Sequence, residues 1–162
     1  MLDMLVKLYD LPDAQPLVAQ CQAEGVRIRR AMAYEKTLVL QMIRKEFHVG
    51  WVDEADVAFT RQPINCIIAT EKGEVVGFAA HDVTARGFFG PTGVRASHRG
   101  RGIGKALLVF SLHALRELGY AYAIIGQAAE QSREFYAKSV GATLIEGSNP
   151  GIYLEWLNPP KE

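Results

Sequence analysis

The sequence predicts one α/β domain with a mixed central sheet flanked by helices on both faces. Three observations predict this class. Apolar runs of strand length alternate with segments whose apolar residues recur at helical spacing through most of the 162 residues. Two β-rich runs within 64–81 flank a short polar turn, which predicts an antiparallel hairpin. A strand, a long helix and a second apolar strand follow at 88–126, which predicts a parallel crossover and therefore a sheet with both kinds of pairing.

Composition and charge set the broad limits of the prediction. Apolar residues make up 49% and charged residues 22% of the chain, which is close to the average of globular proteins. The 18 basic and 18 acidic residues give a formal net charge of zero, so no global positive field predicts binding to nucleic acid or to an anionic membrane. We expect a single domain over 1–162, in which 1–25 form a small N-terminal extension.

The cysteines and the apolar runs indicate the cellular compartment. Cys21 and Cys66 have neither a metal-ligand spacing nor the pattern of a disulfide framework, which favours a reducing environment. No apolar run approaches the roughly 20 residues that span a bilayer, and the N-terminus lacks a basic region followed by an apolar segment. We therefore expect a cytoplasmic protein that needs no metal and binds no membrane. The short terminal strands of two copies could pair in a homodimer.

The N-terminal half is predicted from alternation, helical spacing and capping residues. Asp13 can cap a helix that Gly25 ends, and alternating apolar and charged residues follow in the next strand. The first half is then completed by two further helical segments before the hairpin. The expected elements are strands at 4–9, 26–30, 64–70 and 74–81, and helices at 14–23, 35–47 and 53–59.

The C-terminal half begins with an interrupted strand at 88–94. Pro91 cannot donate to a sheet ladder, so this strand must be bulged or unpaired on one side. The strongest helical pattern of the chain follows and stops at Gly119. The remaining expected elements are helices at 103–118 and 130–140, and strands at 121–126, 142–146 and 152–157.

A glycine-rich turn joins strand 88–94 to the long helix. Gly100, Gly102 and Gly104 lack the Cβ atoms that would keep a ligand from the backbone, so successive N–H groups can converge on one anion. The start of the helix adds unpaired N–H groups and the positive end of the helix dipole. The turn is therefore predicted to bind phosphate. Its mobile positive charge is supplied by Arg95, Arg99, Arg101 and Lys105.

Residue spacing separates this turn from two common nucleotide-binding loops. A Walker A loop would require glycine where Arg99 stands and a hydroxyl where Ala106 stands. A dinucleotide-binding fingerprint would require glycine at Lys105 or at Leu107, depending on its starting glycine. Neither pattern fits, so the sequence excludes both loops.

The turn does fit R-x-x-G-x-G, filled by Arg99, Gly102 and Gly104, and here the sequence resembles the GNAT superfamily of acyl-CoA-dependent N-acyltransferases. The longer family pattern, V-x-x-x-x-R-G-x-G-I-G-x-x-L, is satisfied from Val94 to Leu107. The resemblance implies a GNAT-like splayed sheet, with the pantetheine arm of acetyl-CoA entering the gap beside the bulged strand. The cofactor-binding residues that it implies are Gly93, Val94, Arg99, Gly100, Arg101, Gly102, Ile103, Gly104 and Lys105.

The same resemblance implies an activity, the transfer of an acetyl group from acetyl-CoA to a primary amine of a small molecule or peptide. The segment from Phe135 to Ala142 is similar to the family segment F-Y-x-K-x-G-F, with one extra residue before Gly141. It implies that Tyr136 protonates the departing thiolate, the alternative being an aromatic that only packs. Ala129 stands near the place of an asparagine that often accompanies the motif. A non-catalytic CoA-binding or sensing module is the alternative function.

The sequence leaves the general base and the acceptor pocket open. Residues 88–94 contain no acid, and the remaining candidates for the base are a water molecule or one of four side chains. By family architecture, segments 48–51 and 148–151 form the acceptor pocket, with Trp51 and Phe89 as candidate substrate contacts. A core tryptophan that clamps two helices is the alternative for Trp51. The four side chains are His48, His81, Asp82 and Glu130.

Overall fold

The computed structural model describes residues 1–155 and 157, and it confirms the predicted α/β class. Seven strands and five α-helices form within this part of the chain. The strands are β1 (Leu2–Lys7), β2 (Arg27–Arg30), β3 (Cys66–Glu71), β4 (Glu74–His81), β5 (Phe88–Val94), β6 (Tyr122–Ala128) and β7 (Thr143–Leu144). The helices are α1 (Gln15–Ala23), α2 (Lys36–Glu46), α3 (Val49–Ala58), α4 (Ile103–Glu117) and α5 (Glu130–Val140).

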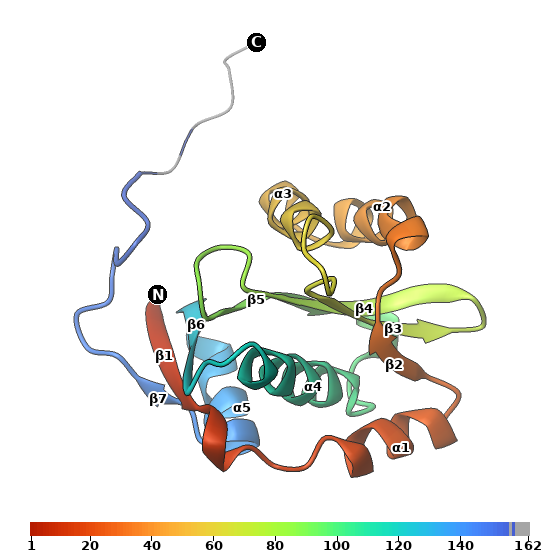
Figure 1. Cartoon of the computed structure of the whole chain (residues 1–162), viewed down its shortest axis with the longest axis horizontal. Coiled ribbons are helices and arrows are strands. Elements are labelled where there is room, and N and C mark those ends of the chain that lie inside the picture. Colours follow the sequence, from red (N-terminus) through yellow and green to blue (C-terminus); the bar gives the residue numbers. More distant parts are fainter. Residues whose placement is uncertain (156, 158–162) are drawn as a thin grey trace.

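One mixed sheet organises the fold, with the strand order β2-β3-β4-β5-β6-β1-β7. Helices α2 and α3 cover one face, and α1, α4 and α5 cover the other (Figure 1). Each face of the sheet carries its own apolar core, and neighbouring residues of β4 point into different cores. Phe78 packs towards α2 and α3, and Ala79 packs towards α4. The predicted parallel crossover is present as β5, α4 and β6.

Strand β5 has the predicted bulge, and it diverges from β6. Its pairing with β4 runs from Val94 opposite Gly77 to Phe89 opposite His81, and one extra residue of β5 is accommodated before Thr92. Its parallel pairing with β6 covers only Phe88 and Phe89. Beyond Phe89 the two strands separate, so the last five residues of β5 keep a neighbour on the β4 side alone.

The N-terminal segment contributes a strand inside the sheet. The sequence predicts a strand at 4–9, whereas β1 runs from Leu2 to Lys7 and is followed by a single 3-10 turn at Leu8–Asp10. Strand β1 lies between β6 and β7 and is antiparallel to both. Val6 and Leu8 are completely buried. Residues 1–10 are therefore part of the same packed body as the crossover.

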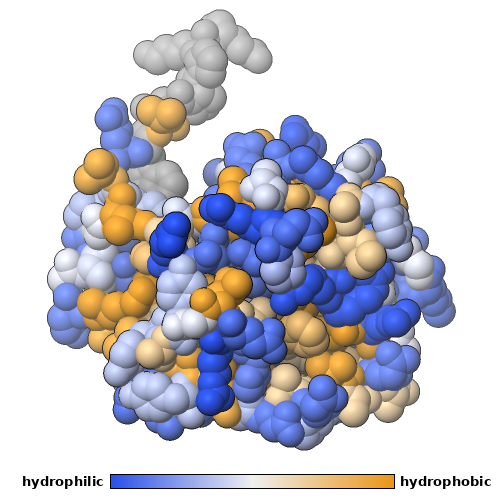
Figure 2. All heavy atoms as spheres, in the orientation of Figure 1, coloured by the Kyte–Doolittle hydropathy of each residue, from blue (hydrophilic) through white to orange (hydrophobic). Residues whose placement is uncertain are grey.

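The expected strands differ most from the structure at the C-terminal end, where the strand expected at 142–146 is reduced to β7. The strand predicted at 152–157 is wrong for 152–155 and 157, which have no regular structure, and residue 156 lies outside the described residues. A strand needs a partner along its length, and the neighbouring β7 is only two residues long. Leu154 and Leu157 stay exposed, and hydrophobic side chains of this segment stand out at the upper left of Figure 2.

Helix α3 starts earlier than the sequence predicts, at Val49 instead of residue 53. The cause is His48, whose ring Nδ1 accepts a hydrogen bond from the Gly50 N–H at 3.1 Å and so caps the helix. As a result, Trp51 belongs to the first turn of α3. In the described residues, none of the helices is long and apolar enough to cross a membrane.

The fully buried His81 predicts a pH dependence of stability. Burial, followed by the nearby charge of Arg30, lowers the pKa of His81 to about 4, below the value near 6.5 of an unfolded chain. Between about pH 6.5 and pH 4 the unfolded chain binds a proton that the folded protein excludes. The free energy of unfolding should therefore fall as pH falls through this window, by roughly 3 kcal/mol from this residue alone.

His81→Met removes this titration while keeping an apolar side chain of similar size. Urea unfolding at pH 6.5 and at pH 5 should show a smaller loss of stability in the variant than in the original protein. An equal loss in both proteins would show that His81 does not carry the dependence.

Candidate active site

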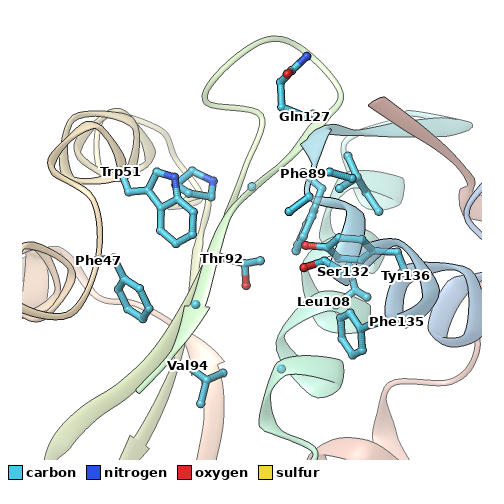
Figure 3. Close-up of a pocket in the computed structure, with 18 of the residues that line it drawn as sticks. Phe47, Trp51, Phe89, Thr92, Val94, Leu108, Gln127, Ser132, Phe135 and Tyr136 are labelled. Atoms are coloured by element: carbon cyan, nitrogen blue, oxygen red, sulfur yellow. The ribbon is translucent and has the colours of Figure 1, made fainter. Parts of the chain in front are cut away.

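A cavity of about 1330 Å³ lies where β5 and β6 diverge. Figure 3 shows β5 passing between two walls of this cavity. Phe47 and Trp51 lie on the side of α2 and α3, and Phe89, Leu108 and Tyr136 lie on the side of α4 and α5. The cavity therefore reaches both faces of the sheet, with the edge of β5 between them.

The backbone of β5 presents hydrogen-bond donors to this gap. The Arg95 N–H donates to the Val76 carbonyl at 2.9 Å, which fixes the alternation of the antiparallel ladder. By that alternation, the N–H groups of Thr92 and Val94 point away from β4, to the side that β6 has left. The Val94 carbonyl accepts a hydrogen bond from Arg99 Nε at 3.2 Å. An extended ligand in the gap would meet these donors as it would meet a neighbouring strand.

Gly93 has the opposite orientation. Its position in the ladder turns its N–H towards Phe78 of β4. Its Cα faces the ring of Phe47, where a Cβ atom would lie 2.6 Å from Phe47 Cζ. Gly93 lines the cavity, and it allows the Phe47 ring to approach the strand.

The glycine-rich turn has the geometry that its sequence predicts. Gly100 and Gly102 have φ angles of +76° and +77°, a backbone region that residues other than glycine rarely adopt. Gly102 is the N-cap residue of α4, so the N–H groups of Ile103, Gly104 and Lys105 have no intrahelical acceptor. The Ile103 side chain is buried, and it therefore presents its backbone to the cavity. The turn and the helix start thus form one surface of N–H donors that is suited to an anion.

Two of the predicted cationic ligands reach the cavity, and one is directed elsewhere. Arg99 and Lys105 line the cavity. Arg101 Nη2 instead donates to Glu71 Oε1 at 2.9 Å, and Arg101 Nε lies 3.6 Å from Glu24 Oε2. Hydrogen bonding to Glu71 raises the pKa of Arg101. The side chain of Arg101 thus joins the turn to the β3–β4 hairpin. The predicted contact of Arg101 with the cofactor stays a prediction, and its backbone is the part left to make it.

Glu71 receives a second hydrogen bond from this turn. His98 Nε2 lies 2.9 Å from Glu71 Oε2, and His98 lines the cavity. The hydrogen bonds from Arg101, and then from His98, lower the pKa of Glu71. One carboxylate therefore fixes both ends of the segment that precedes α4.

Tyr136 lies on the α5 wall of the cavity. Its ring packs edge-to-face on Phe89, with ring centroids 6.4 Å apart, and lies beside the Phe135 ring, with ring centroids 5.3 Å apart. Burial raises the pKa of the Tyr136 hydroxyl, so this group stays protonated at neutral pH. Ser132 lies one turn earlier on the same wall, and Ala129 is the N-cap residue of α5. The arrangement keeps a proton donor at the edge of the gap.

The four side chains considered as a general base are poorly placed for that role. His48 alone among them lines the cavity, and its Nδ1 already accepts the Gly50 N–H, so its neutral form carries the proton on Nε2. Asp82 Oδ1 accepts a hydrogen bond from the Gly87 N–H within the loop between β4 and β5. His81 is completely buried, and Glu130 lies outside the described cavity wall. Nor do the described residues hold a group of three or more His, Cys, Asp or Glu that could bind a metal ion.

Glu54 is the cavity residue that sequence reasoning missed. Among the described residues that line the cavity, it is the single carboxylate. Glu54 Oε1 accepts a hydrogen bond from Thr84 Oγ1 at 2.5 Å. Burial raises the pKa of Tyr153 to about 12, with contributions from the negative charges of Glu54 and Asp3. The signal was the spacing of Trp51 and Glu54 on one helical face, which disappears when the helix is predicted to begin at residue 53.

The two predicted acceptor contacts lie on different walls. Trp51 packs against Phe47 and Phe78, with ring centroids 5.5 Å and 6.2 Å apart, and it also borders the cavity. It is therefore both a packing residue and part of the wall. Phe89 is 3% exposed and packs on Tyr136, on the α4 and α5 side. Trp51 and Phe89 are thus separated by β5 (Figure 3).

A bulged strand that diverges from its parallel neighbour, next to a glycine turn that opens a helix, is the architecture that the resemblance to acyl-CoA-dependent transferases implies. The model of the acetyltransferase (GNAT) family matches residues 36–142, and the chain belongs to this family. No curated protein matches the chain in sequence.

Solved structures share the fold at low sequence identity. The GCN5-related glucosamine N-acetyltransferase region of a fungal multi-domain GH3 beta-N-acetylglucosaminidase is 17% identical, with a TM-score of 0.71 over 89% of this chain and 19% of its own. A GCN5-related N-acetyltransferase from Sphaerobacter thermophilus is 21% identical, with a TM-score of 0.68 over 89% of this chain and 48% of its own. A GNAT family acetyltransferase from Brucella melitensis, in complex with acetyl-CoA, is 21% identical, with a TM-score of 0.53 over 68% of this chain and 80% of its own.

This chain corresponds to only part of the first two structures. The chain spans 19% and 48% of the length of the first two structures. At these identities the likeness shows the fold alone.

The contact between Gly93 and Phe47 predicts a coupled pair. Gly93→Ala should lower the free energy of unfolding by about 1–3 kcal/mol, because the new methyl group overlaps the ring and forces it to shift. Phe47→Leu removes the ring edge, so the double variant should lose less stability than the sum of the two single losses. Urea unfolding of all four proteins measures this coupling. Strict additivity would show that the ring is not what requires glycine at this position.

Proposed function

We propose that this protein transfers an acetyl group from acetyl-CoA to a primary amine of a small molecule or peptide. One observation carries the proposal: a single cavity joins the glycine turn at α4, the unpaired edge of β5 and the partly buried Tyr136. The complex of the Brucella melitensis acetyltransferase with acetyl-CoA supports the choice of co-substrate. Membership of the GNAT family supports the reaction class.

The residues of the cavity fit such a co-substrate. The N–H groups at the start of α4, with Arg99 and Lys105, are suited to a pyrophosphate. The Thr92 and Val94 N–H groups are suited to the amide carbonyls of a pantetheine arm. A strand rises about 3.3 Å per residue, so β5 from Val94 to Phe89 covers roughly 16 Å between the phosphate end and Tyr136. An extended arm would therefore bring its sulfur to the Tyr136 wall.

The bound thioester supplies an activated acyl carbonyl, and the chain supplies hydrogen-bond donors around it. A neutral amine forms the new C–N bond as the C–S bond breaks. An N–H of β5 that faces the gap can donate to the acyl oxygen, where negative charge develops. The Tyr136 hydroxyl, which burial keeps protonated, can donate its proton to the thiolate. The nitrogen releases one proton to water and water returns one proton to the Tyr136 phenolate, so the reaction yields an amide and a free thiol and restores the hydroxyl.

The proposed acid role of Tyr136 predicts the effect of Tyr136→Phe. Removal of the hydroxyl should lower kcat by roughly 100-fold, while the affinity for acetyl-CoA changes little, because the ring that packs on Phe89 remains. Thiol release measured against time gives kcat, and calorimetric titration gives the affinity. An unchanged kcat, with chemistry shown to limit the rate, would reduce Tyr136 to a packing residue.

The anion-binding turn predicts the effect of Arg99→Ala. The loss of one charge-assisted contact should weaken calorimetric binding of acetyl-CoA by about 10- to 100-fold. Arg116→Ala is the matched control, since Arg116 is an exposed arginine in the last turn of the same helix. Equal affinities for Arg99→Ala and the control would remove Arg99 from the site.

The same titration tests the function itself. Absence of acetyl-CoA binding to the original protein would overturn the proposal. Binding without thiol release across a broad panel of amines would favour a non-catalytic CoA-binding or sensing module.

A further inference from the structure

We propose that the acceptor is a small primary amine with one positive charge and an aromatic body, whose ammonium group is bound by Glu54 and whose ring lies against the wall formed by Phe47 and Trp51. The bound ammonium loses one proton to water before its neutral nitrogen attacks the thioester. The inference rests on the proposed acetyl transfer and assigns the acceptor half of the same cavity. Phe47 and Trp51 are called the aromatic wall below.

Glu54 is held in a defined position at one end of the cavity. Trp51 and Glu54 are three residues apart in α3, so they project from the same side of this helix. Thr84, in the loop between β4 and β5, donates its hydroxyl to Glu54 Oε1 at 2.5 Å and leaves the second carboxylate oxygen for another donor. A side chain fixed from two elements is suited to bind one group specifically.

Charge is distributed unevenly along the cavity. Its cationic side chains, Arg99 and Lys105, lie where β5 ends and α4 begins. Glu54 and Thr84 lie at the other end, before β5 begins, and the strand between the two ends is roughly 20 Å long. The anionic co-substrate and a cationic acceptor therefore have separate ends of one cavity.

The single carboxylate limits the charge of the acceptor. A monocation can pair with Glu54, whereas the further ammonium groups of a polyamine would find no other carboxylate on the described wall. A carboxylate on the acceptor would be repelled by Glu54. The neighbouring Tyr153 hydroxyl stays neutral, since burial raises its pKa to about 12. The cavity thus favours an amine without other charged groups.

Aromatic side chains form the surface next to Glu54. The rings of Phe47 and Trp51 lie 5.5 Å apart and 32° from parallel, so together they present a broad apolar face. Phe78 supports both rings from the sheet, at 5.8 Å and 6.2 Å. Gly126, Phe88 and Tyr153 also line the cavity and pack against one another, since a Cβ at Gly126 would lie 2.7 Å from the Tyr153 hydroxyl and 3.1 Å from Phe88. A flat ring gains the most contact with the broad face of Phe47 and Trp51.

The first experiment measures binding rather than turnover. The protein saturated with CoA is titrated in a calorimeter with 2-phenylethylamine and with 2-phenylethanol, which has the same body without the charge. The original protein should bind the amine at least 10-fold more tightly than the alcohol, and Glu54→Gln should remove this preference. Asp53→Asn is the matched control, because Asp53 is the exposed neighbouring acid on the same helix. Equal binding of amine and alcohol to the original protein, or equal effects of the two variants, would overturn the proposal.

The second experiment tests the aromatic wall. Trp51→Leu should weaken binding of 2-phenylethylamine by about 10-fold and leave propylamine binding nearly unchanged, because only the aromatic amine reaches the ring. Equal losses for both amines would contradict the wall as the site of the ring. Spermidine should bind no more tightly than propylamine, and tighter binding would contradict the limit to one charge. Failure of acetyl-CoA to bind the original protein would instead overturn the proposed function, and the affinity of Glu54→Gln for acetyl-CoA should equal that of the original protein.

Discussion

The divergence of β5 from β6 after Phe89 is the constraint on which the rest of the site depends. A continuous parallel ladder would pair the Thr92 and Val94 N–H groups and close the cavity. The bulge, with Pro91 unable to donate, turns β5 away while β4 keeps it in place. The crossover then brings α4 back onto the sheet, so its N-terminus opens at the end of the same gap. Backbone geometry therefore sets the distance between the anion-binding turn and Tyr136.

The second organising feature is the separation of charge. The β3–β4 hairpin holds the turn before α4 through Glu71, which takes the Arg101 side chain out of the site and leaves Arg99 and Lys105 at the cavity. At the opposite end, Glu54 is held by Thr84 and bordered by the aromatic wall. A chain without net charge thus contains a cavity with basic side chains at one end and a carboxylate at the other. This separation of charge is what the proposed placement of the co-substrate and the acceptor at different ends rests on.

The sequence predicted local structure well where a specific residue type determines it. Strand 88–94 and helix 130–140 have the predicted bounds, because Pro91 and the turn glycines leave few alternatives. The position of β1 between β6 and β7 was not predicted, since it depends on pairing with residues more than 100 positions away. Arg101 was chosen by residue type, whereas its direction is set by Glu71, 30 residues earlier. Glu54 was missed because the His48 cap, which places it beside Trp51, is a side-chain effect.

The most direct test of the account is a titration of the isotopically labelled protein with CoA, followed by amide NMR. The account predicts that the Val94 and Thr92 amides shift together with those of Gly102 to Lys105 at the start of α4, because the arm and the phosphates bind in one cavity. The Gly93 amide, which faces β4, should shift least among the residues of this part of β5. Shifts confined to the start of α4, with Val94 and Thr92 unaffected, would contradict the claim that the gap beside β5 receives the arm of the co-substrate.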